Sequence, residues 1–110
     1  MIIFHQVRYD RLIRRGEPVY PREAFVSQWH FYIIRTVDRF LYAGVATDVD
    51  RRFSEHRRGG VRSAKYLRAH KPLKVEFSQL IGKKGLALKV EYRFKLLSKN
   101  VKESIVRGTD

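Results

Sequence analysis

The chain has 110 residues and no cysteine, and its 24 Lys and Arg residues against 11 Asp and Glu residues give a formal net charge of +13 at pH 7. This length suits one domain with a modest core, and the absence of cysteine excludes disulfides and cysteine-ligated zinc sites. No apolar run approaches the ~20 residues that a membrane-spanning helix needs. So large a positive charge favours nucleic acid as the partner rather than an anionic membrane surface, since no clear amphipathic anchor accompanies it. The lack of cysteine also suits a cytoplasmic location.

Residues 1–28 are expected to be an N-terminal extension outside the folded domain, which occupies residues 29–108. The apolar start MIIF is too short for a signal-peptide core, and no basic segment precedes it. Arginines are mixed with acids in this extension, and Pro18 and Pro21 interrupt any helix. We expect it to be poorly ordered, and the alternative is a basic arm that touches nucleic acid.

A strand, a hairpin and a second strand are predicted between residues 30 and 46. His30–Thr36 is a run of β-branched and aromatic residues, which suits a buried or half-buried strand. Val37–Arg39 interrupts this run with a polar centre, as a tight hairpin connection would. Phe40–Ala46 forms the second strand, in which Gly44 indicates a bend or a close approach of the backbone.

A helix is predicted directly after the second strand. Thr47 is placed to cap it, and Asp48 and Asp50 give its first turn the negative charge that suits a helix N-terminus. Arg52 and His56 are four residues apart, so both project from one side of this helix.

Tyr32, Tyr42 and Arg52 follow one another at intervals of ten residues, and His56 follows Arg52 by four. With these residues the chain resembles the GIY-YIG nuclease superfamily, in particular its small single-domain bacterial members. The tripeptide HFY stands where the family has GIY, and YAG stands where it has YIG, so the first signature keeps only its tyrosine and the second keeps its tyrosine and glycine. Glu91 falls where the family has a further functional residue. The resemblance covers about three quarters of the chain, roughly residues 29–106.

The basic run, defined as Arg57–Lys71, contains no acid. A short helix is predicted over Arg62–His70. The cations suit contact with a nucleic-acid backbone, and Tyr66 offers a stacking platform; the alternative is a solvated face with Tyr66 packed at its base. The predicted nucleic-acid-binding residues are Arg57, Arg58, Arg62, Lys65, Arg68 and Lys71.

A third strand and two further helices are predicted in the remainder of the chain. Leu73–Leu80 alternates apolar and polar residues, which is a half-buried pattern that turns Leu73, Val75, Phe77 and Gln79 inward. A helix over Leu86–Ser98 places Glu91 at the border of a buried stripe formed by Leu86, Val90, Phe94 and Leu97. A last helix is expected over Asn100–Val106. These elements predict an α+β fold with a three-stranded, mainly antiparallel sheet flanked by helices, and the resemblance implies the same architecture.

The resemblance implies an endonuclease that hydrolyses phosphodiester bonds with a divalent metal ion, Mg²⁺ or Mn²⁺. Such hydrolysis needs a deprotonated water, stabilised phosphate charge and a protonated or metal-held leaving oxygen. Glu91 would bind the metal, and Arg52 would hold two phosphate oxygens. Tyr42 would take the proton from water, its pKa lowered by nearby positive charge, and Tyr32 would hold the water or phosphate, although the two tyrosine roles can be exchanged. His56 would act as a proton relay or a phosphate contact.

DNA is the expected substrate. We expect no attached DNA-binding domain, so target choice should be weak or supplied by a protein partner. Two positions depart from the family pattern, since many members carry a basic residue at the position of Val45 and an asparagine at the position of Glu103.

Two other functions stay open at this point. The first is a catalytically silent basic module that binds nucleic acid, which Val45 favours. The second is a small basic interaction protein, for instance a ribosome-associated one, in which the two tyrosines are structural. Under such functions Glu91 would simply pair with Lys95 four residues on, and Arg52 with Glu55 or Asp48.

Overall fold

The computed structural model describes residues 28–108, so the expected N-terminal extension lies outside the described residues apart from Gln28. The strands are β1 (Trp29–Thr36), β2 (Leu41–Ala46) and β3 (Pro72–Gly82), and they form one antiparallel sheet in the order β2-β1-β3. The helices are α3 (Val49–Arg58), α4 (Lys65–Ala69), α5 (Lys84–Lys95) and α6 (Lys99–Arg107). The predicted α+β class with a three-stranded antiparallel sheet is confirmed.

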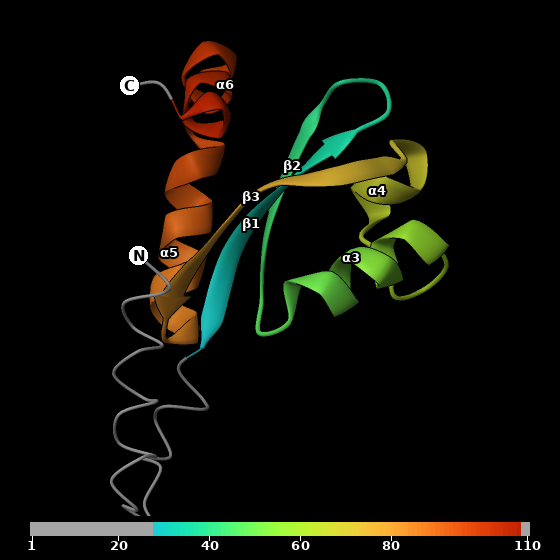
Figure 1. Ribbon diagram of the computed structural model, residues 1–110, viewed down its shortest axis with the longest axis horizontal. Coiled ribbons are helices and arrows are strands. Elements are labelled where there is room, and N and C mark those ends of the chain that lie inside the picture. Colours follow the sequence, from blue (N-terminus) through green and yellow to red (C-terminus); the bar gives the residue numbers. More distant parts are fainter. Residues whose placement is uncertain (1–27, 109–110) are drawn as a thin grey trace, which may run out of the picture.

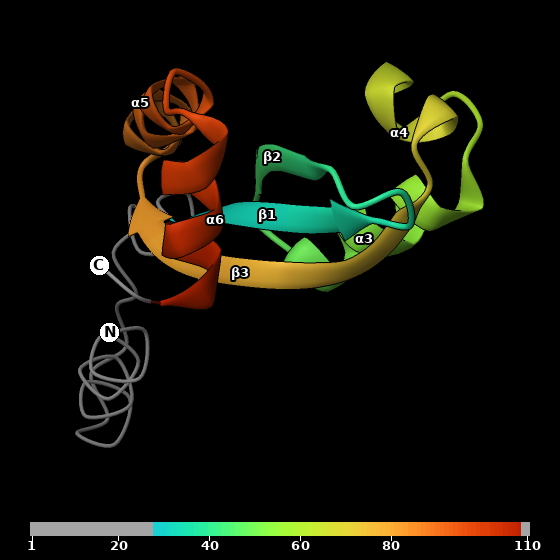
Figure 2. The ribbon, with the colours of Figure 1, turned by 90° about the horizontal axis from the view of Figure 1, so that it is seen from above.

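The helices lie on both sides of the sheet. In Figure 1, α3 and α4 lie to one side of the strands and α5 and α6 to the other, and Figure 2 shows the same separation from above. Along β1, Phe31 packs in a core cluster with Phe94 of α5, whereas Tyr32 and Ile34 pack in an opposite cluster with Leu67 of α4. All five side chains are at most 6% exposed. Burial on both faces explains why β1 is an almost uninterrupted apolar run in the sequence.

The regular alternation predicted for the third strand is wrong, because β3 pairs irregularly with β1. Successive residues of β1 pair with Phe77 and Val75, so Glu76 between them has no partner at that point, as in a β-bulge. Phe77 therefore packs on the α5 side of the sheet and Val75 on the α4 side. Leu73, which was expected to point inward, is 52% exposed.

The helix that follows β2 begins one residue later than predicted. Asp48, not Thr47, is the N-cap of α3, and its carboxylate accepts a hydrogen bond from the Arg51 amide at 3.0 Å. An aspartate cap adds negative charge at the positive end of the helix, which favours Asp48 over its neutral neighbour.

The helix predicted over Arg62–His70 is shorter in the structure, where α4 begins only at Lys65. Gly60 has a φ of +80°, and Ala64 is extended with a ψ of 142°. Residues 59–64 therefore form a loop. The helix predicted over Leu86–Ser98 ends earlier in the structure, since α5 stops at Lys95. Two residues of its predicted buried stripe are exposed, namely Leu86 at 52% and Leu97, which follows α5, at 36%.

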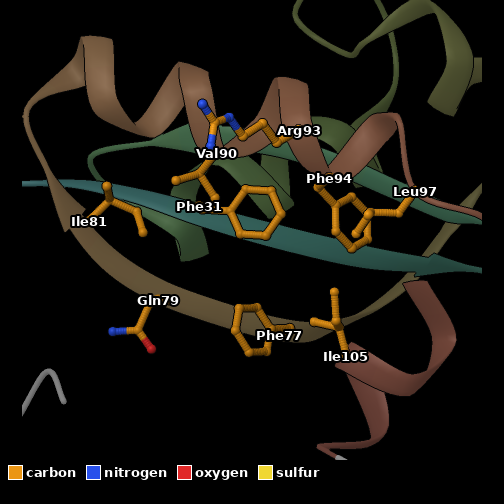
Figure 3. Close-up of a pocket in the computed structure, with 9 residues that line it drawn as sticks. All are labelled: Phe31, Phe77, Gln79, Ile81, Val90, Arg93, Phe94, Leu97 and Ile105. Atoms are coloured by element: carbon orange, nitrogen blue, oxygen red, sulfur yellow. The ribbon is translucent and has the colours of Figure 1, made fainter. Parts of the chain in front are cut away.

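An apolar pocket of about 310 Å³ lies between the sheet and the C-terminal helices. Figure 3 shows the residues that line it, which are Phe31, Phe77, Gln79, Ile81, Val90, Arg93, Phe94, Leu97 and Ile105. The Phe31 ring meets Phe94 and Phe77 edge-on, with centroids 5.4 and 6.2 Å apart. This side of the core is thus incompletely filled by its own side chains. None of the helices within residues 28–108 is long and apolar enough to cross a lipid bilayer.

Candidate active site

Tyr32 of β1 and His56 of α3 are hydrogen-bonded in the interior, where each is at most 2% exposed. The Tyr32 hydroxyl oxygen lies 3.1 Å from Nε2 of His56. Nδ1 of His56 accepts a hydrogen bond from the backbone amide of Ala64 at 3.2 Å. A ring nitrogen that accepts carries no proton, so in the neutral imidazole the proton is on Nε2, which donates to the Tyr32 oxygen.

The imidazole of His56 is held in its neutral form. Burial lowers its pKa to about 4, and the nearby Arg52 charge acts in the same direction. At neutral pH the donor to Tyr32 is therefore fixed. With Nε2 bonded to Tyr32 and Nδ1 bonded to the Ala64 amide, the neutral His56 ring has no nitrogen left for a phosphate, and the observed contact is one that orients Tyr32.

Gly44 of β2 pairs with Tyr32 across the sheet, and the tyrosine ring lies against its backbone. A Cβ atom at residue 44 would stand 2.5 Å from the Tyr32 hydroxyl oxygen and 2.7 Å from Cζ. Only glycine leaves room for the ring at this distance. The sequence left open whether Gly44 marks a bend or a close approach of the backbone, and the structure has the close approach.

Tyr42 of β2 is half-buried and meets the His56 ring edge-on, with centroids 5.6 Å apart. Burial raises the pKa of Tyr42, and the charges of Lys95 and Arg52 oppose this effect without overcoming it. Burial also raises the pKa of Tyr32, and the neighbouring Tyr42 adds to the rise. The expectation that positive charge lowers the pKa of Tyr42 is thus wrong for the protein alone, because desolvation is the larger effect. Both hydroxyls keep their protons at neutral pH.

Arg52 of α3 projects toward the same tyrosines, and its charge acts on both of them. One of its terminal nitrogens, Nη1, donates to Glu55 at 3.0 Å and to the carbonyl oxygen of Arg62 at 2.6 Å. The alternative pairing of Arg52 with Glu55 is therefore present. A side chain 32% exposed can still offer its remaining donors to a phosphate.

Glu91 reaches the site from the other layer of the molecule. Its charge acts on Tyr32 and Tyr42, although it belongs to α5. Because β2 is an edge strand against which α5 packs, a carboxylate on α5 can act across that edge. Its Oε2 lies 2.6 Å from Nζ of Lys95, so the alternative Glu91–Lys95 pair is also present.

The donor set at Glu91 restricts which metal sites are possible. Within residues 28–108 no three His, Asp or Glu side chains gather closely enough to hold a metal ion by themselves. Mg²⁺ commonly uses one or two carboxylates and completes its shell with waters and substrate phosphates. A single carboxylate, 16% exposed, fits that kind of site and not a cage built from protein alone.

The basic run lies on the α3 and α4 side of the sheet (Figure 1). Arg57 and Arg58 line a hollow of about 320 Å³ with Ser54 at the end of α3. The Arg62 side chain is 77% exposed, yet its Nη1 lies 3.7 Å from Glu55, which partly neutralises it. All six cations of the predicted surface are exposed, namely Arg57, Arg58, Arg62, Lys65, Arg68 and Lys71.

Two contacts of the site were missed in the sequence. The Ala64 amide that fixes the tautomer of His56 is a backbone group, so no side-chain pattern could indicate it. The stacking of Tyr66 on Tyr42, with centroids 6.0 Å apart, joins residues from separate elements. Tyr66 was predicted as a stacking platform for nucleic acid or as a residue packed at the base of the basic face, and its contact with Tyr42 was not foreseen.

Comparisons with known proteins agree with this arrangement. Residues 28–104 match the model of the GIY-YIG catalytic domain. A UPF0213 protein of Enterobacter sp. (strain 638) is 49% identical over 80 residues, which cover 73% of this chain and 76% of the relative. A UPF0213 protein of Klebsiella pneumoniae is 48% identical over 82 residues, covering 74% and 76%, and the UPF0213 protein YhbQ of Escherichia coli O8 is 44% identical over 81 residues, covering 74% and 79%. No solved structure gave a significant match.

Proposed function

This chain belongs to the GIY-YIG catalytic domain family, a family of nucleases, and from that premise we propose that it is a metal-dependent endonuclease that hydrolyses phosphodiester bonds of DNA. The observation that supports this most is the convergence of Tyr32, Tyr42 and His56 in one contact group, with Arg52 and Glu91 close enough for their charges to act on the tyrosines. These residues come from both helical layers and the sheet between them.

Each residue has a role that follows from its surroundings. Glu91 would hold a Mg²⁺ or Mn²⁺ ion, which when bound stabilises charge on the phosphate and lowers the pKa of nearby hydroxyl groups and water. Arg52 binds phosphate oxygens with the donors that Glu55 leaves free. Tyr42, the more exposed tyrosine, would act as the phenolate: after its own hydroxyl proton has gone to solvent, its oxygen takes the proton from the attacking water. Tyr32, whose oxygen accepts a hydrogen bond from Nε2 of His56, would direct its own hydroxyl proton toward substrate oxygen.

The proposed partner is nucleic acid, bound through the exposed cations of the basic run. Target choice would be weak or would come from a protein partner. A cytoplasmic location, expected from the absence of cysteine, is part of the same proposal.

The test is cleavage by the purified full chain of plasmid DNA, branched DNA and RNA, with Mg²⁺, with Mn²⁺ and with a chelator. Glu91→Gln should abolish metal-dependent cleavage, whereas Asp50→Asn, which removes an exposed acid of α3, should not. Tyr42→Phe should slow cleavage by about 10²–10⁴-fold, the usual size of a general-base contribution. Tyr92→Phe is the matched control, because Tyr92 is 64% exposed on α5. Parental activity in Glu91→Gln would show that this carboxylate does not hold the metal.

A catalytically silent nucleic-acid-binding module is the second candidate. The pairing of Glu91 with Lys95 at 2.6 Å favours it, because the carboxylate is already neutralised, and Val45 stands where many family members have a basic residue. Such a protein would bind nucleic acid in a salt-sensitive way and would respond neither to Mg²⁺ nor to Glu91→Gln. Lack of cleavage of all three substrates would make it the better description.

A further inference from the structure

A hydrogen bond between side chains joins the β1–β2 hairpin to the end of α4. Oδ2 of Asp38 lies 2.6 Å from Nδ1 of His70. Oδ1 of Asp38 accepts a hydrogen bond from the hydroxyl of Thr36 at 2.6 Å, and Thr36 is completely buried. Both carboxylate oxygens are thus engaged, so the hairpin presents Asp38 to His70 in a fixed orientation.

The ring of His70 continues this contact to the candidate active site. It stacks on Tyr66, with centroids 4.4 Å apart and an interplanar angle of 27°. Tyr66 in turn stacks on Tyr42, with centroids 6.0 Å apart and an angle of 19°. Phe40 also meets His70 edge-on, with centroids 5.0 Å apart. An unbroken series of ring contacts therefore connects the hairpin to Tyr42.

Helix α4 needs outside support to hold Tyr66 in this place. It has five residues, too few for a helix that is stable by itself, and its first residue has no side-chain cap. Leu67 anchors it, being 1% exposed, but Tyr66 is 40% exposed, so its ring depends on the contacts with His70 and Tyr42 to stay in place. The supports at the far end of α4 are the His70–Asp38 pair and a backbone bond from the Val37 amide to the Lys71 carbonyl, 2.9 Å long.

We propose that Asp38 and His70 are positioning residues of the nuclease site, which hold Tyr66 against Tyr42 and so fix the orientation of the Tyr42 hydroxyl toward substrate. This inference rests on the proposed function, because the orientation of Tyr42 affects a rate only if Tyr42 takes part in cleavage. A purely structural pair would affect stability and leave the rate of the folded protein unchanged.

The kinetic test uses the purified full chain with plasmid DNA and Mg²⁺, below the unfolding temperature of every variant. Asp38→Ala and His70→Ala should lower kcat by about 10- to 10²-fold, as expected for an Å-scale misplacement of a reacting group, and leave KM unchanged. Asp38→Asn keeps an oxygen acceptor for His70 and should restore most of kcat. Val37→Ala is the control, since Val37 is 57% exposed in the same hairpin. A parental kcat in both alanine variants would overturn the proposal.

A second measurement does not depend on cleavage. In protein with isotope-labelled tyrosine rings, Asp38→Ala should shift the NMR signals of Tyr66 and Tyr42 and leave Tyr92 in place. Val37→Ala should shift none of the three. If the parent protein cleaves no nucleic acid, the proposed function fails, and these shifts alone decide whether the pair positions Tyr42. Unchanged Tyr42 signals in Asp38→Ala would overturn the proposal even in an active nuclease.

Discussion

The guanidinium group of Arg35 binds both carboxylate oxygens of Glu103, at 2.7 and 2.8 Å, and its Nε donates to Glu76 at 2.9 Å. Arg35 lies in β1, Glu76 in β3 and Glu103 in α6, so the last helix is tied to two strands by one side chain. Glu103 stands where many family members carry an asparagine. In this chain Glu103 instead forms a structural ion pair with Arg35.

Glu103→Ala should therefore lower the free energy of unfolding by about 1–3 kcal/mol, the range for a hydrogen-bonded charged group left without its partner. All three side chains are at most 20% exposed, so water compensates only partly. Urea unfolding at pH 7 measures the effect. In the double variant Arg35→Met/Glu103→Ala, the loss in free energy of unfolding should be smaller than the sum of the losses in the two single variants. Additive effects would mean that the pair contributes nothing.

Gly44→Ala should disturb the site more than the fold around it. The new methyl group would clash with the Tyr32 ring at 2.5 to 2.7 Å, so we expect a loss of about 1–3 kcal/mol, as in other overpacked cores, together with loss of cleavage. Gly85→Ala is the matched control, because it lies in α5 with no atom within 4 Å of the added carbon. It should raise the free energy of unfolding by about 0.5–1 kcal/mol. Equal stability of the two variants would contradict the tight contact.

His56 should make the protein less stable as the pH falls below 6.5. The unfolded chain takes up a proton near pH 6.5, whereas burial lowers the pKa of His56 in the fold to about 4. Between these values the unfolded state binds more protons, so the free energy of unfolding should fall by up to about 1.4 kcal/mol per pH unit.

Urea unfolding at pH 7.5, 6.5, 5.5 and 5.0 measures this slope. Hydrogen bonds to neighbouring side chains lower the pKa of the carboxyl groups of Asp38, Glu55 and Glu103. These acids therefore keep their charge over the pH range of the measurement and affect stability only below it. His56→Asn removes the titration and should flatten the slope, even if the variant is less stable at every pH. A slope that persists in this variant would assign the effect to another group.

The basic run should carry much of the electrostatic affinity for nucleic acid. Replacing Arg62, Lys65 and Arg68 with alanine should weaken binding to all DNA sequences alike and reduce the salt slope by up to about 0.9 per lost phosphate contact. Arg62 should contribute least, because Glu55 partly neutralises it. The control variant replaces the exposed Lys89, Lys99 and Arg107 of α5 and α6, which changes the net charge equally. Equal salt slopes for the two variants would place the contact surface elsewhere.

The local pattern of the sequence was enough to predict β1, β2 and the side of α3 that carries Arg52 and His56, because residue preference for strands, a hairpin break and helical spacing depend only on near neighbours. The inward face of β3 was not predictable in this way. The bulge at Glu76 reverses which side each residue faces, and it arises from pairing with β1, which is distant in the chain. The raised pKa of Tyr42 was missed for a similar reason, since desolvation depends on the assembled core.

The spacing of contacts along the chain also bears on the order in which parts of the domain open. The Tyr32–His56 bond joins residues 24 apart, whereas the Arg35–Glu103 bond joins residues 68 apart. Closing the longer loop costs about 0.9 kcal/mol more in chain entropy, and α6 has no residue that is fully buried. Amide hydrogen exchange should therefore be faster in α6 than in α3. Partial opening from the C-terminal end, if it extends into α5, would withdraw Glu91 while Tyr32 and His56 stay joined. The proposed metal binding would then be lost before the sheet itself opens.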